Sequence, residues 1–247
     1  MKEVWYTDKG FPYPENDSNY YDVKDFPALA DIEKHWDEIK PEIKRFIDEK
    51  DKSFRANSYQ NINIEGAWSS LPFIFWSGIL SNEFRKKCPV SWAYLMKIKG
   101  ITSLSLSLLS PHSSIARHRG DTNAVIRCHL GIEVPERLPQ CGLKVKEEER
   151  GWAEGKWLLF NDACIHSAWN NSDMRRIVLI IDVIRPEFLK RKTDICTHIL
   201  TYQIINNQMG RSKSFKDSSF FVKTFLFGLV YSILSVYRPV LNFIRGT

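Results

Sequence analysis

The sequence predicts a mainly β domain, built as a sandwich or a jelly roll, with helices ahead of it and an apolar helix behind it. Three observations support this fold class. Short strand-like segments follow one another from residue 101 to residue 184, with turn-rich stretches and no helical pattern between them. Helical spacing of apolar residues comes before this region, and a strongly apolar stretch follows it. The 247 residues suffice for one sizeable domain with additions.

The first 100 residues predict an arm and helices. Residues 1–27 are rich in Tyr, Asp, Pro and Asn without periodicity, which is typical of an extended arm. From 28 to 52, apolar residues recur at helical spacing with charges between them, which predicts a helix or a helix pair. Pro41 is expected to break this stretch or to begin its second helix. Another helix is expected over 81–97, where Pro89 interrupts it or separates two short helices.

Strands are expected from residue 101 onward. Residues 101–109 alternate hydroxyl side chains with leucine, as in a strand with one buried face. The charged run K-V-K-E-E-E-R is most simply an exposed hairpin, and no internal repeat is visible. The other predicted strands are 124–134, 143–148, 156–160 and 177–184.

The C-terminal segment differs in character from the rest. Residues 220–244 are strongly apolar, interrupted by Lys223, Arg238 and Pro239, and their uncharged core, 224–237, has 14 residues, short of the roughly 20 that span a bilayer. Basic flanks and aromatic residues favour an interfacial or re-entrant membrane anchor. The alternative is a helix packed on the domain or on a second subunit. The chain is therefore expected to divide into an arm (1–27), a domain with its leading helices (28–190) and a tail (191–247).

Charge and cysteine content narrow the class of protein. The 35 basic and 29 acidic residues give a net charge of +6, which fits a membrane surface or an anionic substrate. A dense stripe of Lys and Arg is not visible, so no nucleic-acid partner is expected. The five cysteines are odd in number and form no C-x-x-C pair, which argues against a disulfide framework or a structural zinc site. The N-terminus lacks the apolar run of a signal peptide, so we expect a cytoplasmic location, either free or at the inner face of the membrane.

Three histidines and two arginines fall on predicted strands or strand ends. His118 begins H-x-G at the end of a loop that leads into the strand with Arg127 and His129, His166 follows the apolar strand W-L-L-F, and Arg176 opens the last strand. Neutral imidazoles are good iron ligands, and a guanidinium pairs well with a carboxylate. In a jelly roll, an early and a late histidine can meet in the barrel mouth. This layout is typical of iron- and 2-oxoglutarate-dependent oxygenases.

One ligand usual in such iron sites is missing. Gly120 stands where a carboxylate is expected, two residues after the first histidine. Asp121 is one residue out of phase and should point elsewhere, so we expect water in the vacant position. His129 shares the side-chain phase of Arg127, and both can face the pocket, although a buried structural histidine is the alternative for His129.

The ordered motifs H-R-G-D-T-N, R-C-H-L-G, W-x-E-G-K, F-N-D-x-x-x-H-x-x-W and R-I-V-L-I-I-D-V resemble the aspartyl/asparaginyl β-hydroxylase family. The resemblance is densest from 107 to 186. It implies a double-stranded β-helix, the jelly-roll or cupin-like core, with N-terminal flanking helices and a C-terminal apolar helix. It also implies Fe(II) as cofactor, with 2-oxoglutarate and O₂ as co-substrates.

The resemblance implies roles for single residues. His118 and His166 match the iron ligands, and with Arg176 they form the implied catalytic set. Gly120 matches a position where the animal enzymes also have glycine, whereas bacterial relatives that hydroxylate lipid A acyl chains tend to keep aspartate. The implied 2-oxoglutarate-binding residues are Trp68, Ser107, Arg127, His129 and Arg176.

Other residues near these motifs have plainer interpretations. Asn161 and Asp162 are expected either to orient the loop that carries His166 or simply to form a turn. Trp152 and Trp157 are interpreted as packing residues. Arg175 is expected to face solvent, because strand alternation allows only one of two neighbouring arginines inside.

The expected function is that of a hydroxylase, an Fe(II)/2-oxoglutarate-dependent dioxygenase acting on an unactivated C–H bond. The family name favours the β-carbon of an Asp- or Asn-type residue, in a peptide, as a free amino acid or in a related small substrate. The apolar tail favours a lipid acyl chain at the inner membrane face, with peripheral membrane association through 220–244. A non-catalytic jelly-roll binding module is the third possibility.

Overall fold

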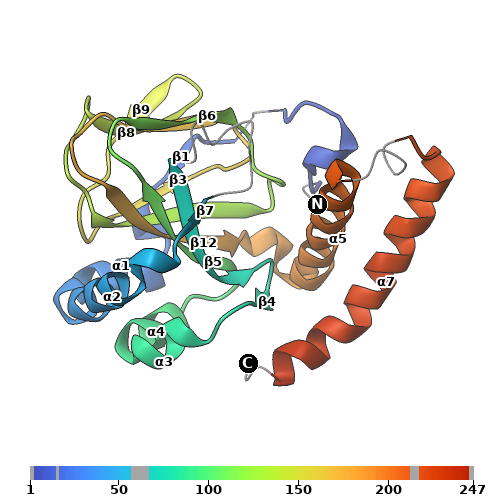
Figure 1. The fold of residues 1–247 in the computed structure, drawn as a ribbon, viewed down its shortest axis with the longest axis horizontal. Coiled ribbons are helices and arrows are strands. Elements are labelled where there is room, and N and C mark those ends of the chain that lie inside the picture. The colour runs from blue at the N-terminus through green and yellow to red at the C-terminus, as the bar shows by residue number, and fades with distance from the viewer. Residues whose placement is uncertain (1–2, 15–16, 57–66, 212–216, 245–247) are drawn as a thin grey trace.

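A computed structural model describes residues 3–14, 17–56, 67–211 and 217–244. Parts of the predicted arm and tail, 1–2, 15–16, 212–216 and 245–247, lie outside the described residues, as does 57–66. Two antiparallel sheets form the centre of the molecule, with one group of helices on each side (Figure 1).

The larger sheet runs in the order β1-β10-β7-β12-β5-β3-β2, with β4 paired to β3, and the smaller in the order β6-β11-β8-β9. The strands of the larger sheet are β1 (Tyr20–Tyr21), β2 (Arg55–Ala56), β3 (Trp68–Phe75), β4 (Gly78–Ile79), β5 (Ile101–Leu109), β7 (Val125–Glu133), β10 (Trp157–Phe160) and β12 (Arg176–Ile184). Those of the smaller sheet are β6 (Ser113–His118), β8 (Cys141–Val145), β9 (Glu148–Arg150) and β11 (His166–Asn170).

The pairing of these strands is that of a jelly roll. β5 pairs with β12, β6 with β11, β7 with β10 and β8 with β9, all antiparallel. A long hairpin that is rolled up produces this nested order, because each strand of the first half meets its counterpart from the second half. The predicted fold class is therefore confirmed. The charged run predicted as a hairpin forms β8 and β9 with the turn between them.

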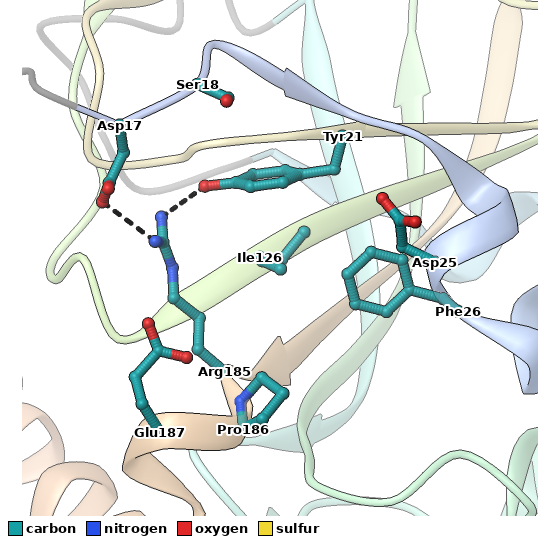
Figure 2. Close-up of a pocket in the computed structure, with 9 residues that line it drawn as sticks. All are labelled: Asp17, Ser18, Tyr21, Asp25, Phe26, Ile126, Arg185, Pro186 and Glu187. Carbon is teal, nitrogen blue, oxygen red and sulfur yellow. Dashed lines mark hydrogen bonds and ion pairs between the residues drawn. The ribbon is translucent and has the colours of Figure 1, made fainter.

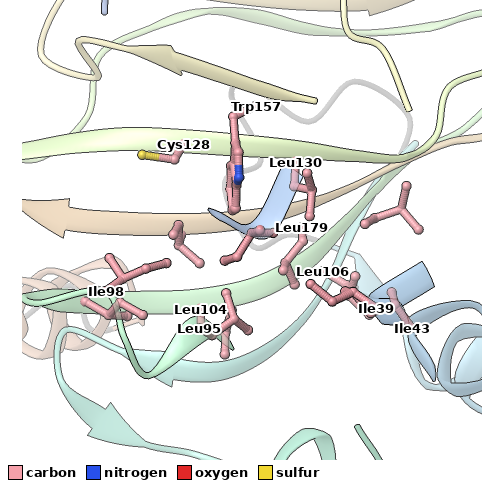
Figure 3. Packing of buried hydrophobic residues seen from close by; sticks show 14 of the residues in the cluster. Ile39, Ile43, Leu95, Ile98, Leu104, Leu106, Cys128, Leu130, Trp157 and Leu179 are labelled. Atoms are coloured by element: carbon pink, nitrogen blue, oxygen red, sulfur yellow. The ribbon is translucent and has the colours of Figure 1, made fainter. Parts of the chain in front are cut away.

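The N-terminal helices cover the outer face of the larger sheet. They are α1 (Pro27–Lys34), α2 (Trp36–Lys50), α3 (Glu83–Lys87) and α4 (Pro89–Leu95). A short 3-10 turn, η2 (Val23–Asp25), precedes α1, and another, η3 (Asp51–Ser53), follows α2. Their apolar residues pack against alternate residues of the strands, such as Leu104, Cys128 and Leu179 (Figure 3). Because side chains alternate along a strand, the residues between these positions point to the opposite face of the sheet, into the barrel.

The prediction that Pro41 divides the first helical stretch is wrong. Pro41 lies inside α2, and the helix boundary is at His35. The buried residues Ile39 and Ile43 lie on the two sides of the proline and face the same core, so tertiary packing holds the helix across it. Pro89, by contrast, begins a separate short helix, which is one of the two predicted arrangements.

The C-terminal residues form two long helices. After η5 (Pro186–Arg191), α5 (Lys192–Arg211) packs Ile195, Cys196 and Ile199 against the arm and the strand ends. The arm itself contains η1 (Thr7–Lys9). α7 (Phe220–Ile244) lies along α5, on its side away from the sheets (Figure 1). By length and composition, 220–240 is apolar enough to cross a membrane, and its apolar side chains are exposed or half-buried, whereas Arg238 is buried.

Candidate active site

Two histidines meet on adjacent strands of the smaller sheet. His118 ends β6 and His166 begins β11, and the two residues are paired in the antiparallel register. Their ring centroids are 4.2 Å apart. Sequence reasoning placed His118 at the end of a loop, but it is the last residue of a strand, so the sheet itself fixes its position relative to His166.

Hydrogen bonds fix the tautomer of both rings. Nδ1 of His118 lies 2.8 Å from the carbonyl oxygen of Ala116, and Nδ1 of His166 lies 2.9 Å from that of Cys164. Since a carbonyl oxygen only accepts, each Nδ1 carries the proton and donates it. Burial lowers the pKa of His118, and burial together with the neighbouring His118 ring holds the pKa of His166 well below its usual value. Both rings are therefore neutral, with a lone pair on Nε2 of the kind that binds a transition metal.

The carboxylate of Asp162 fills the space beside Gly120. A Cβ added to Gly120 would lie 1.7 Å from Oδ2 of Asp162, and the Gly120 amide donates to the Asp162 carbonyl oxygen at 2.7 Å. Oδ1 of Asp162 lies 3.5 Å from Nε2 of His166. An acidic group thus reaches the histidine pair from position 162. Over the described residues no group of three or more His, Cys, Asp and Glu side chains is arranged to hold a metal ion.

Arg127 holds this aspartate. It donates to both carboxylate oxygens of Asp182, at 2.8 and 2.9 Å, and its Nη1 lies 2.7 Å from Oδ1 of Asp162. Burial alone would lower the pKa of Arg127, but the two carboxylates outweigh it and raise that pKa. The sequence assigned Arg127 to the co-substrate. The structure instead directs its guanidinium to two protein carboxylates.

Arg176 and His129 carry buried donors that have no partner in the part of the chain that the structure describes. Arg176 is 1% exposed, its guanidinium carbon lies 4.6 Å from the ring centre of Trp152, and burial lowers its pKa to about 10. Within the described residues neither Nε nor Nη2 of Arg176 has a hydrogen-bond partner. A buried, unpaired guanidinium is costly, so an arrangement of this kind is typical of a binding site for an anion.

The same reasoning applies to His129. Its Nδ1 accepts a hydrogen bond from Nε1 of Trp152 at 3.3 Å, which leaves the proton of the neutral ring on Nε2. Burial, with the charges of Arg176 and Arg127, holds the pKa of His129 well below its usual value. Nε2 is buried and has no partner among the described residues. It is therefore a second donor available to a ligand.

Trp68 and Ser107 lie beside this group. Nε1 of Trp68 donates to Oγ of Ser107 at 3.0 Å, and the Trp68 ring centroid is 6.3 Å from that of His118. Ser107 is buried and pairs in register with Val178, two residues after Arg176 on β12. Inside the barrel, the ring of Phe160 meets both His129 and His166 edge-on, at 5.1 Å each.

Two residues have a larger part in the site than the sequence indicated. Asp162, interpreted as a loop-orienting or turn residue, contacts Arg127 and approaches His166. Trp152, interpreted as packing, contacts both Arg176 and His129. Two sequence features could have indicated these roles. One is the four-residue spacing between Asp162 and His166 in N-D-x-x-x-H, and the other is the motif W-x-E-G-K, which begins at Trp152. Asp121 lies outside the site and accepts hydrogen bonds from Gln203 of α5.

A separate cavity of about 280 Å³ lies outside the barrel (Figure 2). Ile126 forms part of its lining, and strand alternation places this side chain on the opposite face of β7 from Arg127 and His129. Arg185 crosses the cavity to donate to Asp17 at 2.9 Å. This contact fastens the arm to the end of β12, and the cavity is not part of the site described above.

The chain is similar in sequence to proteins named as hydroxylases. A protein from Rhizobium tropici named ornithine lipid ester-linked acyl 2-hydroxylase is 34% identical over 67% of this chain and 60% of its own length. The aspartyl/asparaginyl beta-hydroxylase of Mus musculus is 31% identical over 64% of this chain and 22% of its length. A solved structure of a predicted oxalate decarboxylase from Thermotoga maritima aligns with 12% identity and a TM-score of 0.34, over 54% of this chain and 96% of the other.

The chain thus spans about 60% of the first of these relatives and under a quarter of the second. The family model described as Aspartyl/Asparaginyl beta-hydroxylase matches residues 33–186, which include every strand of the jelly roll from β5 to β12 and both members of the histidine pair. The chain belongs to the aspartyl/asparaginyl β-hydroxylase family.

Proposed function

We propose that the protein is an Fe(II)- and 2-oxoglutarate-dependent dioxygenase that hydroxylates an unactivated C–H bond. The observation that carries this proposal is a set of buried donors on Arg176 and His129 that have no partner among the described residues, together with two neutral histidines. The lone pairs of the histidines suit iron, and the donors suit the carboxylates of 2-oxoglutarate. The residues present therefore fit both the metal and the co-substrate.

His118 and His166 would hold the iron through Nε2, oriented by the carbonyl groups that accept from their Nδ1 atoms. With 2-oxoglutarate and O₂, bound iron supplies the oxidising power that turns C–H into C–OH, while 2-oxoglutarate becomes succinate and CO₂. The carboxylate of Asp162, fixed by Arg127, lies beside His166, and the lack of a side chain at Gly120 leaves room for it. The protein's part is to hold the metal with few ligands and leave room for the co-substrates.

Arg176 would take the distal carboxylate of 2-oxoglutarate through Nε and Nη2, which have no partner within the described ranges. Ser107, held by Trp68, is placed on the neighbouring strand to add a hydrogen bond. His129 would donate from Nε2 to the other end of the co-substrate, because Trp152 occupies its Nδ1. Arg127 acts indirectly, through the carboxylates that it already binds.

Two substrate classes are candidates. The family to which the chain belongs favours the β-carbon of an Asp- or Asn-type residue or a related small substrate. The relative named as an ornithine lipid acyl 2-hydroxylase, together with the exposed apolar face of α7, favours a lipid acyl chain. We place the protein in the cytoplasm, at the inner face of the membrane, with 220–244 as the contact.

An anaerobic titration tests the cofactors. Addition of Fe(II) and then 2-oxoglutarate to the metal-free protein should produce the weak metal-to-ligand charge-transfer absorption of the chelate, and His166→Ala should abolish it. In air, the wild-type protein should convert 2-oxoglutarate to succinate, and EDTA should stop the reaction. Binding without succinate formation would favour the non-catalytic jelly-roll module, and turnover in metal-free protein would exclude the proposal.

The substrate is a separate measurement. The active protein is incubated with Asp- and Asn-containing peptides and, in parallel, with total lipid extract, and products are examined by mass spectrometry for the gain of one oxygen atom. A product in the peptide arm alone supports the Asp/Asn class. A product in the lipid arm alone supports the acyl chain.

A further inference from the structure

α7 has two different faces. A helix advances about 100° per residue, so residues three, four and seven apart share a face. On this basis Phe227, Tyr231 and Arg238 lie together on one side of α7. The exposed apolar residues from Phe221 to Val240 lie on the other side, over an arc of about 160°, whereas the first residue, Phe220, is 77% exposed and falls on the side of Arg238.

The first face is bound to α5. Arg238 is 7% exposed, and its Nη1 donates to Oγ1 of Thr197 at 2.9 Å. The hydroxyl of Tyr231 donates to Asp194, and the ring of Phe227 lies 5.0 Å from that of His198. These contacts extend over about three turns of α7 and about one turn of α5. They hold α7 against the body of the protein. A helix that crossed a bilayer would have to give up these contacts.

The second face has no protein partner among the described residues. It is uncharged and widely exposed, because its members are 45–82% accessible. The residues of this face are Phe221, Val222, Phe225, Leu229, Ile233, Val236, Tyr237 and Val240. The face extends along a helix of about 37 Å and has aromatic residues toward both ends, a distribution typical of helices in the membrane interface.

The polar groups on the exposed part of α7 are suited to an apolar environment. Ser232 donates to the carbonyl oxygen of Gly228, and Ser235 to that of Tyr231, each at 2.8 Å. Both serines are exposed, yet their hydroxyl protons are used within the helix. Transferring these hydroxyls from water to lipid therefore costs little free energy, because the helix already provides an acceptor for each proton.

Charge distinguishes a lipid surface from other occupants. Residues 220–244 contain no Asp or Glu. The two charged residues of this segment, Lys223 and Arg238, are both basic. Lys190 and Arg191 are exposed at the end of η5, where Arg191 pairs with Asp194. Positive charge beside a broad uncharged face suits anionic lipid headgroups. A second helix would need a narrow seam of apolar residues, and this face is broader than such a seam.

We propose that this outward face of α7 seats the protein on an anionic lipid bilayer, with the helix lying in the plane of the interface and its opposite face remaining on α5. The inference rests on the proposed membrane association and adds its mode, its residues and its lipid class. It does not depend on the iron chemistry. α5 also contacts the segment after His118, through Gln203 and Asp121, so the membrane contact and the site are joined through one helix.

Vesicle sedimentation of the full chain tests the proposal. Phe225 and Phe11 are 70% and 69% exposed, one on α7 and the other on the arm, so Phe225→Asp and Phe11→Asp form a matched pair. The wild type and Phe11→Asp should sediment with phosphatidylcholine/phosphatidylglycerol vesicles and only weakly with phosphatidylcholine alone. Phe225→Asp should lose at least tenfold in partitioning while its circular dichroism and thermal unfolding stay unchanged.

Three outcomes would overturn the proposal. Equal binding of both variants, or no binding of the wild type, removes the role of α7. A concentration-dependent dimer in analytical ultracentrifugation that Phe225→Asp abolishes assigns the face to a second copy. Resistance of bound wild type to extraction at alkaline pH indicates a spanning helix. Fe(II) and 2-oxoglutarate binding, measured on the same preparations in solution, reports separately on the proposed function.

Discussion

The Asp162 carboxylate stands where a side chain on Gly120 would begin, since a Cβ at that glycine would lie 1.7 Å from Oδ2. The same carboxylate lies 3.5 Å from Nε2 of His166 and 2.7 Å from Nη1 of Arg127. A carboxylate at position 120 and this carboxylate at position 162 therefore exclude one another. Glycine at position 120 therefore leaves the space that the Asp162 side chain needs. Asp162 lies in the connection between β10 and β11 and reaches the histidine pair from there.

Gly120→Ala should displace Asp162 and separate it from Arg127. Disrupting a buried ion pair costs on the order of 3 kcal/mol, so the free energy of unfolding should fall by about that amount, with at least a tenfold loss in succinate formation. Denaturant unfolding and a succinate assay measure the two effects. In Gly120→Ala/Asp162→Ala the clash is absent, so the two changes should not add. Strict additivity would refute the steric relationship.

Gly228 provides the control for this substitution. A Cβ there would meet no atom within 4 Å, and the residue lies inside α7. Gly228→Ala should leave the unfolding free energy unchanged or raise it by up to about 1 kcal/mol, because alanine has the higher helix propensity.

Arg176→Met should weaken 2-oxoglutarate binding and stabilise the protein without it. The methionine retains an apolar side chain but removes a buried guanidinium whose Nε and Nη2 lack partners within the described residues. We expect the KM for 2-oxoglutarate to rise at least 100-fold, and the unfolding free energy of the ligand-free protein to increase by about 1 to 3 kcal/mol. A structural arginine would instead lose stability on substitution.

The neighbouring Arg175 is the matched control. It pairs with Glu133 at 2.9 Å and with Asp51, outside the barrel. Arg175→Met should change the KM by less than about twofold and lower stability by at most about 1 kcal/mol, the usual effect of a half-exposed ion pair.

Trp152→Phe should impair co-substrate binding through His129. The variant keeps an aromatic ring near Arg176 but removes the N–H that donates to Nδ1 of His129. His129 is then free to carry its proton on Nδ1 and to offer an acceptor where a donor is needed. A KM for 2-oxoglutarate about tenfold higher, with unchanged Fe(II) affinity, is expected from steady-state assays and metal titration.

Trp157→Phe separates this effect from loss of packing. Nε1 of Trp157 donates to the carbonyl oxygen of Leu29 at 3.0 Å, in the core beneath α1. This variant should lower the melting temperature and leave the KM unchanged. Equal changes in KM for Trp152→Phe and Trp157→Phe would contradict the role given to Trp152.

The strands with regular alternation could be predicted from the sequence, and the short polar ones could not. The strand at 101–109 has its predicted bounds because serine and leucine alternate along it. β6, with S-S-I-A-R-H, and β11, with H-S-A-W-N, lack a long apolar pattern and are held by pairing with each other and with β8. The two members of the histidine pair, His118 and His166, lie on these two strands, so the sequence showed the histidines but not the two strands that carry them.

The contact partners of the buried charged side chains could not be predicted from the sequence either. His129 and Arg127 share a phase, as expected, but phase does not reveal that Asp182 and Asp162 surround the arginine. These contacts join residues 35 or more positions apart, and only the folded arrangement of strands brings them together. The position of Asp162 against Gly120 likewise depends on a close approach between two chain segments, which no local pattern encodes.

Asp121 connects the segment after His118 to α5. Its carboxylate accepts from Nε2 of Gln203 at 3.0 and 3.1 Å. Burial and the nearby charge of Asp162 raise the pKa of Asp121 to about 6. A raised folded-state pKa means that protonated Asp121 contributes stability fully below the unfolded pKa of about 4, and that this contribution is lost as the pH rises through about 6.

Asp121→Asn should therefore stabilise the protein at neutral pH and not at acid pH. Asparagine keeps an oxygen acceptor for Gln203 and carries no charge at any pH. Because Asp121 is only partly buried by surface area, we expect a gain of about 1 to 2 kcal/mol at pH 7.5 that vanishes near pH 4. Asp48→Asn, at an exposed position of α2, should change stability by less than about 0.5 kcal/mol at both pH values. Thermal unfolding across this pH range measures the difference, and a gain that persists at pH 4 would exclude titration of Asp121 as its cause.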